Sequence, residues 1–314
     1  MAATAFVFPG QGSQAVGMLA DVGDQAVLQQ AYAEASGRLG YDLWALTQQG
    51  PEEQLTQTEF TQPAILTASI ALWRLAREGG AADPQAVAGH SLGEYSALVA
   101  AGVLTLGDAA YIVQQRGRFM QAAVPVGVGS MAAILGLEDA QIEGICKEVS
   151  TEAAVAQPAN YNAPGQLVIA GHAAGVEKAV EACKAAGAKR AAQLAVSAPF
   201  HSSLMAPAAQ DLKPVLESVE FSAPHFKVVQ NVDAQFCADP DTIRANLIRQ
   251  VDSAVLWSQI VRSLQNDGIE RMVECGPGKV LTGLNRRIDR EIESLNIGDA
   301  GSLDASLAAD GMRA

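Results

Sequence analysis

The sequence predicts an α/β fold in which a domain with a mainly parallel sheet carries a smaller inserted domain. Three observations lead to this expectation. Short apolar runs alternate with helical patterns over most of the 314 residues, which is typical of parallel strands joined by crossover helices. Hydrophobic residues make up 49% of the chain, enough for a substantial core. Between residues 131 and 196 the pattern changes to strand, helix, strand, strand, helix, strand, an order typical of ferredoxin-like domains.

The first expected element is a buried strand over residues 4–8. The loop after it places two glycines around Gln11, which allows a tight turn whose backbone N–H groups point one way. Thr61 is expected to cap the longest helix of this part, and Gly79 and Gly80 are expected to end it. The helices expected here cover residues 25–37, 51–57 and 61–77.

A nucleophile elbow is expected between residues 86 and 93. The apolar run 86–88 leads into Gly-His-Ser-Leu-Gly, and a helical pattern over residues 94–104 leads out. This strand–turn–helix order presents the hydroxyl of the central serine, Ser91, above a sheet edge and at a helix N-terminus, where negative charge is stabilised. Ser91 is therefore the candidate nucleophile. The alternative is a glycine-rich turn without chemistry.

The inserted domain follows a further helix that begins at Leu106. Residues 124–130, rich in valine and glycine, are expected to be a linker. Strands are expected at residues 131–135, 153–161, 166–170 and 189–196, helices at 138–149 and 173–187, and a hairpin turn at 162–165. We therefore expect the inserted ferredoxin-like domain to cover residues 126–196, and the large α/β domain to cover residues 1–125 and 197–314.

The remainder of the large domain continues the alternation of strands and helices. Strands are expected at residues 226–230 and 270–274, and helices at 202–218, 240–249 and 254–266. The last fifteen or so residues are rich in glycine, alanine, serine and aspartate, so we expect a loose tail there.

Composition narrows the classes of function. The net charge of −13 argues against nucleic acid as the main partner. The longest apolar stretch, residues 97–106, is too short to span a membrane, and no basic residue precedes Arg38 as a secretory signal would require. We expect a soluble, cytoplasmic protein that does not bind a membrane. No metal site is expected, because the cysteines match no zinc spacing and are expected to be free thiols: Cys146, Cys183, Cys237 and Cys275.

A serine nucleophile needs a base within hydrogen-bond reach, most often a histidine. His90 adjoins the serine, and the elbow should turn its side chain away. His172 has the place of a turn or cap residue, and His225 precedes an apolar strand. His201 lies in a loop where the chain re-enters the large domain, so elimination favours it as the base. Acidic residues are plentiful, and none stands out as a third member.

At this point the sequence resembles the malonyl-CoA:acyl-carrier-protein transacylases and the acyltransferase domains of fatty acid and polyketide synthases. The resemblance runs from about residue 5 to about residue 290. It rests on FPGQGSQ at residues 8–14, GHSLGE at 89–94, QRG at 115–117, NYNAPGQ at 160–166, PFH at 199–201 and ECGPG at 274–278. Several motifs in one order are far more specific than any single motif.

The resemblance implies a hydrolase-like α/β domain with a ferredoxin-like insertion. It implies a catalytic pair formed by Ser91 and His201, with the imidazole held by the backbone carbonyl of Gln250 in place of a carboxylate. It also implies an oxyanion hole made by the backbone N–H groups of Gln11 and Leu92. The implied enzyme is an acyltransferase that acts through a malonyl-serine intermediate by a ping-pong mechanism.

Substrate residues are implied in the same way. Arg116 would bind the free carboxylate of a malonyl group, because a guanidinium binds a carboxylate with two hydrogen bonds. Without the resemblance, a surface helix arginine would be the slightly favoured interpretation of Arg116. Asn160 and Asn162 would shape the pocket, although a hairpin rich in asparagine also forms for turn reasons. Phe200 matches the malonyl-selective form of the related synthase domains.

The implied substrates are malonyl-CoA and the phosphopantetheine thiol of acyl carrier protein, in fatty acid synthesis. No bound cofactor is implied, and a monomer is expected. Because carrier protein and chain are both acidic, docking needs a local basic rim. Scattered solvated charges are the alternative for each candidate: Lys189, Arg190, Lys279, Arg286, Arg287 and Arg290.

Two other functions use the same residues differently. A hydrolase would have the same elbow with water as the acceptor, but Arg116 and the lack of an evident triad acid argue against it. A non-catalytic scaffold that binds a carrier protein would need only the fold. The joint presence of Ser91, His201 and Arg116 argues against that function.

Overall fold

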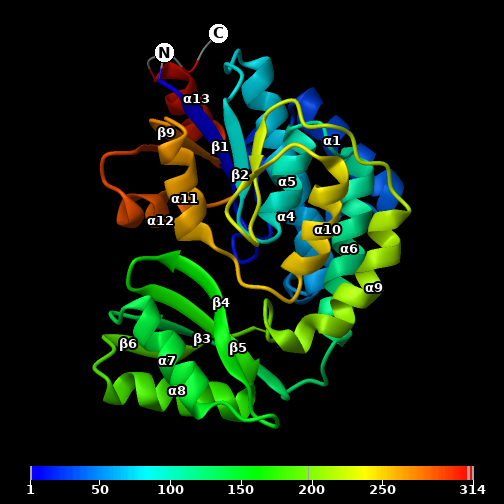
Figure 1. The fold of residues 1–314 in the computed structure, drawn as a ribbon. Helices are drawn as coiled ribbons and strands as arrows, with labels where there is room; N and C mark the ends of the chain where they lie inside the picture. The colour runs from blue at the N-terminus through cyan, green and yellow to red at the C-terminus, as the bar shows by residue number, and fades with distance from the viewer. Residues whose placement is uncertain (1, 197, 310–311, 313–314) are drawn as a thin grey trace.

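The computed structural model describes residues 2–196, 198–309 and 312. Within this part of the chain, two sheets organise the molecule (Figure 1). None of the described helices combines the length and the hydropathy that a membrane span requires.

The larger sheet is mainly parallel, as expected. Its order in the described residues is β10-β9-β1-β2-β7-β8, and only the pair of β7 and β8 is antiparallel. In the centre, Phe8 of β1 lies opposite Gly89 of β2, so the two strands end side by side. The strands are β1 (Thr4–Phe8), β2 (Ala86–Gly89), β7 (Lys227–Val229), β8 (Phe236–Cys237), β9 (Arg271–Cys275) and β10 (Glu293–Ile297).

Both faces of this sheet are buried. Along β1, Phe6 and Phe8 face the larger core, whereas Ala5 and Val7 face a second one, as the two-residue period of a strand requires. The larger core packs under α1 (Ala26–Leu39), α4 (Thr58–Glu78), α5 (Gly93–Ala100), α6 (Leu106–Ala122), α9 (Ala206–Glu217) and α10 (Pro240–Gln250). The second core packs under α11 (Trp257–Asn266) and α12 (Val280–Ile288).

The smaller sheet has the ferredoxin-like order β4-β5-β3-β6, with all described neighbours antiparallel. Two helices cover one of its faces and bury a separate small core. Its elements are β3 (Gly129–Leu135), α7 (Asp139–Val149), β4 (Ala156–Ala163), β5 (Gln166–His172), α8 (Ala173–Ala185) and β6 (Arg190–Gln193). We propose residues 126–196 as a domain of its own, inserted into one formed by residues 1–125 and 197–314.

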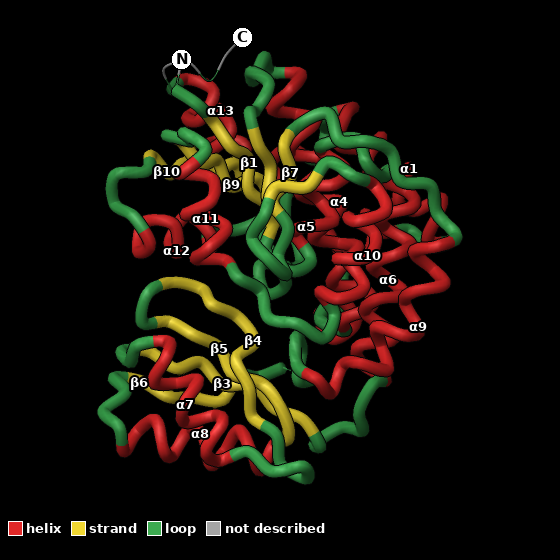
Figure 2. Tube along the Cα trace, viewed as in Figure 1, coloured by secondary structure: helices red, strands yellow, loops and turns green. Residues whose placement is uncertain are grey.

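Strand β4 attaches the smaller sheet to the rest of the molecule. The N–H of Tyr161 donates to the carbonyl of Val255 at 2.9 Å, and the N–H of Val255 donates to the carbonyl of Ala159 at 2.9 Å. His90, directly after β2, also lies with its Nε2 2.8 Å from Oδ1 of Asn162 in β4, so the smaller sheet lies beyond the carboxyl ends of β1 and β2. Figure 2 shows loops gathered between the two sheets at this place.

Several expected boundaries are wrong, each for a local reason. Thr61 is not a cap, because α4 begins a turn earlier, at Thr58, and the Thr61 hydroxyl donates to the carbonyl of Leu55 at 2.6 Å. The expected helix 51–57 is the shorter α3 (Glu52–Leu55). A helix that was not expected, α2 (Leu43–Gln49), precedes it and begins where the Asp42 carboxylate accepts the N–H of Ala45 at 2.8 Å.

The expectation of a loose tail is also wrong for most of its length. Helix α13 (Ala300–Ala308) begins with a capping box in which Asp299 and Ser302 bond each other's backbone, and it buries Leu307 against the larger core. Residues 310–311 and 313–314 of the expected tail lie outside the described residues. Short side chains that suggest a flexible end here form a capped helix that buries one face at Ser306 and Leu307.

Close backbone contact at the end of β2 generates the first prediction. A Cβ atom on Gly93 would lie 2.0 Å from the carbonyl oxygen of Phe8, which no rotamer can relieve. We expect Gly93→Ala to lower the free energy of unfolding by about 3 kcal/mol or more, measured in urea. Gly37→Ala is the control, because Gly37 lies in α1 with open space around it. This control should raise stability by up to about 1 kcal/mol. Equal stability of the two variants would contradict the prediction.

Candidate active site

The candidate nucleophile stands on a strained turn between β2 and α5. Ser91 has a φ of 52°, a left-handed conformation that costs a residue with a Cβ atom of order 1–3 kcal/mol. The turn is tight because a Cβ on Gly89 would meet the carbonyl carbon of Gly93 at 1.9 Å. The motif therefore needs glycine at these positions, because the end of β2 and the start of α5 lie too close together for a Cβ atom.

The structure brings Ser91 and His201 together across 110 positions of sequence. The Ser91 hydroxyl lies 2.6 Å from Nε2 of His201, and Nδ1 of His201 lies 2.9 Å from the backbone carbonyl of Gln250. Because a carbonyl can only accept, Nδ1 carries the ring proton and Nε2 is left to accept from the serine. The arrangement is that of a nucleophile and a base, with a carbonyl in the place of a triad acid.

The base is held uncharged by its surroundings. His201 is 3% exposed. Burial, and then the positive charge of Arg116, lower the pKa of His201 to about 3, and the hydrogen bond to Gln250 only partly opposes them. A neutral imidazole at neutral pH can take the proton of a serine hydroxyl.

Arg116 reaches the same point from α6. The guanidinium is 2% exposed, and burial lowers its pKa. Nη2 donates to the hydroxyl of Ser91 at 3.1 Å and to Oε1 of Gln250 at 2.9 Å, and Nη1 donates to Oε1 of Gln62 at 2.9 Å. No carboxylate of the described residues is hydrogen-bonded to it. A buried cation with only neutral acceptors is suited to bind an anion beside the nucleophile.

The proposed oxyanion donors belong to two loops that leave the sheet side by side. Gln11 lies in the exposed loop after β1, and Leu92 is buried directly after Ser91. The N–H of His90 donates to the carbonyl of Phe8 at 3.0 Å, so the two loops are joined at their base.

The pocket residues implied by resemblance lie at the junction of the two sheets. Nε2 of His90 lies 2.8 Å from Oδ1 of Asn162, so His90 points toward the smaller sheet and away from the dyad. Asn160 is buried in β4, where it forms an isolated bridge with Val255. Phe200 is half-buried next to His201 and packs against both the larger core and β3–β5.

Sequence analysis missed the residues that hold the elbow. Oδ1 of Asn231 accepts the N–H of Ser91 at 2.7 Å, and Nδ2 donates to the carbonyl of Gly89 at 2.7 Å. Glu94, in the first turn of α5, is buried among amides that include Gln250. A signal for Asn231 did exist. It follows a buried strand, and the carboxyl ends of neighbouring parallel strands meet at one edge.

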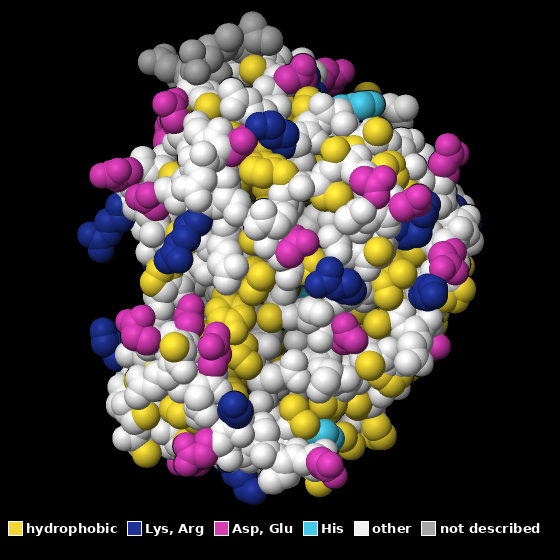
Figure 3. Space-filling model, viewed as in Figure 1, with side chains coloured by type: hydrophobic (Ala, Val, Ile, Leu, Met, Phe, Trp, Pro, Cys, Tyr) yellow, Lys and Arg dark blue, Asp and Glu magenta, His cyan; other side chains and the backbone are white. Residues whose placement is uncertain are grey.

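The basic docking candidates are all exposed, and two of them have partners. Arg287 donates to Oε1 of Gln166 in the smaller sheet, and Arg286 donates to the carbonyl of Ser294 at 3.2 Å. Arg190 begins β6 and Lys189 directly precedes it, and Lys279 is the residue before the first turn of α12. Figure 3 shows single basic side chains scattered among acidic ones on the face drawn.

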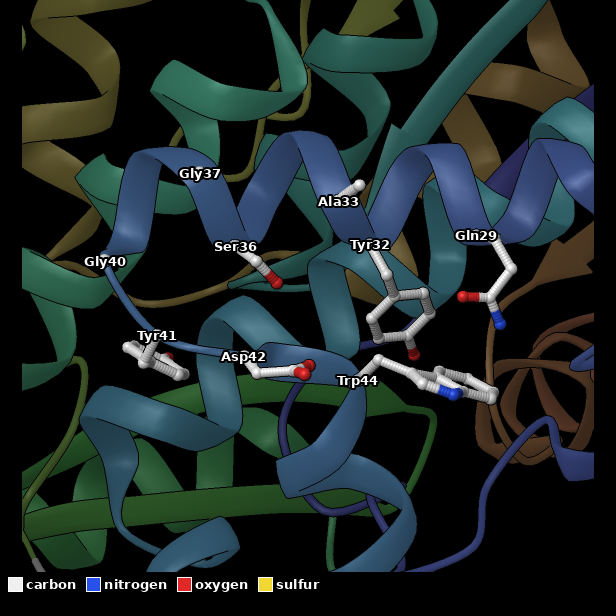
Figure 4. Close-up of a pocket in the computed structure, with 9 residues that line it drawn as sticks. All are labelled: Gln29, Tyr32, Ala33, Ser36, Gly37, Gly40, Tyr41, Asp42 and Trp44. Atoms are coloured by element: carbon white, nitrogen blue, oxygen red, sulfur yellow. The ribbon is translucent and has the colours of Figure 1, made fainter.

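A surface hollow of about 490 Å³ lies elsewhere, between α1 and α2 (Figure 4). The Tyr32 side chain of α1 packs against Trp44 of α2, with ring centroids 4.8 Å apart, and Asp42 lies beside them. The residues lining this hollow do not include the dyad or Arg116. Among the described residues, no cluster of histidine, cysteine and acidic side chains could hold a metal ion. The dyad is therefore the better candidate for chemistry.

Comparison with known proteins agrees with this geometry. A sequence model of the acyl transferase domain matches residues 5–297. The malonyl CoA-acyl carrier protein transacylase of Salmonella typhimurium is 53% identical over 304 residues, covering 96% of this chain and 98% of that protein. An acyl carrier protein S-malonyltransferase from Vibrio cholerae is 52% identical, with a TM-score of 0.94 over 96% of this chain and 99% of that one.

A third relative was solved with a partner. It is a malonyl-transacylase in complex with its type II PKS acyl-carrier protein, 51% identical to this chain, with a TM-score of 0.94 over 97% of this chain and 98% of that one. The large sheet with an antiparallel companion sheet is thus the architecture of these structures.

The surroundings of His201 generate the second prediction. We expect its ring to stay uncharged between pH 8 and pH 5 in the free protein, because burial and Arg116 oppose the added proton. NMR of ring-labelled histidine measures this, with the His201 signals identified by their loss in His201→Ala. A titration midpoint near the ordinary value of 6.5 would contradict it.

Proposed function

This chain belongs to the acyl transferase domain family, and on that premise we propose that Ser91 and His201 transfer a malonyl group from malonyl-CoA to the phosphopantetheine thiol of an acyl carrier protein. One observation carries the assignment. The Ser91 hydroxyl lies between a neutral base, 2.6 Å away, and a buried guanidinium, 3.1 Å away. A nucleophile flanked in this way suits an acyl group that carries its own carboxylate.

In the first half-reaction, Oγ of Ser91 attacks the thioester carbonyl while Nε2 of His201 takes the hydroxyl proton. The carbonyl of Gln250 holds the imidazole in the required tautomer and stabilises the imidazolium that forms. The C–S bond then breaks, and His201 returns the proton to the departing thiolate of coenzyme A. A malonyl ester of Ser91 remains.

The negative charge on the thioester oxygen needs donors during this step. We propose the backbone N–H groups of Gln11 and Leu92, one from each of the two adjoining loops. Leu92 also opens α5, whose N-terminus adds a partial positive charge. A donor of this kind typically lowers the barrier of acyl transfer by about 2.7–4 kcal/mol.

Arg116 would bind the malonyl carboxylate. In the free protein one N–H of Nη2 donates to the Ser91 hydroxyl. Once the serine is acylated, this N–H can donate to the malonyl carboxylate instead. Such a charge-assisted contact contributes about 1.5–3 kcal/mol, a preference over acetyl of about tenfold to a hundredfold. Asn160, Asn162 and Phe200 would form the walls of this acyl pocket.

In the second half-reaction, His201 takes the proton of the phosphopantetheine thiol, and the thiolate attacks the malonyl ester. The ester C–O bond breaks, His201 returns its proton to Ser91, and the malonyl thioester leaves on the carrier protein. We propose that the chain works as a monomer that needs no cofactor. We further propose that an acidic carrier docks against Lys189, Arg190, Lys279, Arg286 and Arg287.

The third prediction tests the nucleophile. We expect malonyl-CoA to add the mass of one malonyl group to the intact protein, and Ser91→Ala to abolish this addition. Ser96→Ala is the matched control, because Ser96 lies on α5 with a buried hydroxyl that bonds no described residue. Ser96→Ala should acquire the group as the unaltered protein does. Labelling that persists in Ser91→Ala would refute the assignment, and rapid release of free malonate without a carrier would indicate a hydrolase.

The fourth prediction tests acyl selectivity. We expect Arg116→Ala to reduce the malonyl-to-acetyl ratio of kcat/KM by about tenfold to a hundredfold, because only malonyl loses an ion pair. Arg118→Ala is the control, since Arg118 leaves the same helix toward Glu59 at the surface. An unchanged ratio in Arg116→Ala would remove the role proposed for this arginine.

A further inference from the structure

A buried carboxylate next to the dyad has no part in the chemistry proposed above. Glu94 is 1% exposed and lies three residues after Ser91, in the first turn of α5. Among the described residues, its hydrogen-bond partners are all amide donors. Oε2 accepts Nε2 of Gln250 at 2.6 Å and the N–H of Asn231 at 3.4 Å, and Oε1 accepts Nε2 of Gln230 at 3.3 Å.

Two chains of amides converge on this carboxylate, each beginning at an arginine. In the first, Arg249 donates to Oδ1 of Asn246 at 2.9 Å, Nδ2 of Asn246 donates to Oε1 of Gln230 at 2.7 Å, and Gln230 donates to Glu94. In the second, Arg116 donates to Oε1 of Gln250, which donates to Glu94. Every donor therefore points toward Glu94, as its negative charge requires.

This polarity fixes the side-chain amide of Gln250. A guanidinium has only donors and a carboxylate has only acceptors, so Oε1 of Gln250 must face Arg116 and Nε2 must face Glu94. The same Nε2 donates to the carbonyl of Ser91 at 2.9 Å. An amide turned by 180° would oppose donor to donor at Arg116 and acceptor to acceptor at Glu94.

We propose that Glu94 is a positioning residue for acyl selectivity: by fixing the amide of Gln250, it aims the guanidinium of Arg116 at the acyl group on Ser91. The inference rests on the proposed function, because Arg116 matters here only as the site of the substrate carboxylate. Glu94 itself touches neither substrate nor nucleophile hydroxyl. It acts through one amide, whose oxygen is one of the two amide oxygens that accept hydrogen bonds from Arg116.

The Glu94 carboxyl group is expected to change its charge near neutral pH. Burial raises the pKa of Glu94 to about 7, against the hydrogen bonds from Gln250, Asn231 and Gln230 and the positive charge of Arg116 on α6. The hydroxyl of Tyr95, beside it on α5, also feels this charge. A protonated Glu94 carries a donor where all its neighbours are donors and has lost its charge, so acidification through pH 7 weakens its hold on the amide of Gln250.

The first arm of the test compares acyl groups in Glu94→Gln, a variant of nearly equal shape. Malonylation and acetylation of Ser91 are followed separately, at saturating and limiting acyl-CoA. We expect kcat/KM for malonyl transfer to fall about tenfold or more and kcat/KM for acetyl transfer to change by less than about threefold. The reason is that only the malonyl group has a carboxylate for a correctly oriented Arg116 to bind. Gln250→Leu removes the amide through which Glu94 acts. Because Gln250 also holds His201 and the Ser91 carbonyl, both rates should change in this variant, and the readout is its malonyl-to-acetyl ratio, which should fall.

The double variant sharpens the first arm. If the effect of Glu94 passes through Gln250, then Glu94→Gln combined with Gln250→Leu should lose no more selectivity than the larger single loss. Glu274→Gln is the matched control. Glu274 is also a fully buried carboxylate that accepts backbone N–H groups, from Leu281 and Thr282. Within the described part of the chain, it forms no hydrogen bond with the dyad or Arg116. It should lower stability and leave the malonyl-to-acetyl ratio unchanged.

The second arm is a pH profile, which a merely structural role would not produce. In the unaltered protein the malonyl-to-acetyl ratio should fall as pH drops through about 7, and in Glu94→Gln it should be low and independent of pH. An equal loss for both acyl groups in Glu94→Gln, or a flat ratio in the unaltered protein, would overturn the inference while malonylation of Ser91 still stands. Failure of malonyl-CoA to label the unaltered protein would instead remove the proposed function.

Discussion

A single buried cation beside the nucleophile constrains the rest of the site. The guanidinium of Arg116 is held by the amide oxygens of Gln62 and Gln250, and by no carboxylate of the described residues. Burying such a charge costs several kcal/mol, which neutral amides offset only in part. Burial, and then this same charge, lower the pKa of His201 and keep its ring neutral. An acyl group with its own carboxylate would complete the ion pair, and an acetyl group would not. Selectivity for malonyl over acetyl would therefore follow from a buried positive charge that has no carboxylate partner before the substrate binds.

The site can meet this demand because parallel strands end together. The loops after β1 and β2 leave the sheet side by side, and Asn231, after β7, ties the elbow at both Gly89 and Ser91. The C-terminal end of α10 then delivers Gln250, whose backbone holds His201 and whose side chain holds Arg116. One residue thus connects the base to the cation. The smaller sheet closes the far side through β4.

Predictions from the sequence succeeded where a local pattern carries its own physical cause. Glycines at positions 89 and 93 signal backbone contact, and the structure shows that contact. The alternation of strands and helices gave the parallel sheet, and the βαββαβ order gave the smaller one. Predictions failed where stability comes from packing or capping. Helix α2 depends on a cap by Asp42, and α13 depends on the capping box and on the burial of Leu307, although its composition resembles that of a flexible tail.

The sequence by itself determined the strand, turn and helix of the elbow, the proposal of His201 among four histidines and the alternation of strands and helices, because each depends on neighbours along the chain or on a short list of chemical candidates. Resemblance added Arg116 and the carbonyl of Gln250. Only the tertiary structure decided that the amides of Asn231 and Gln250 and the carboxylate of Glu94 form one network with the dyad. Asparagine, glutamine and glutamate are common surface residues. Their role depends on which donors and acceptors surround them once water is excluded, and the folded backbone sets those surroundings.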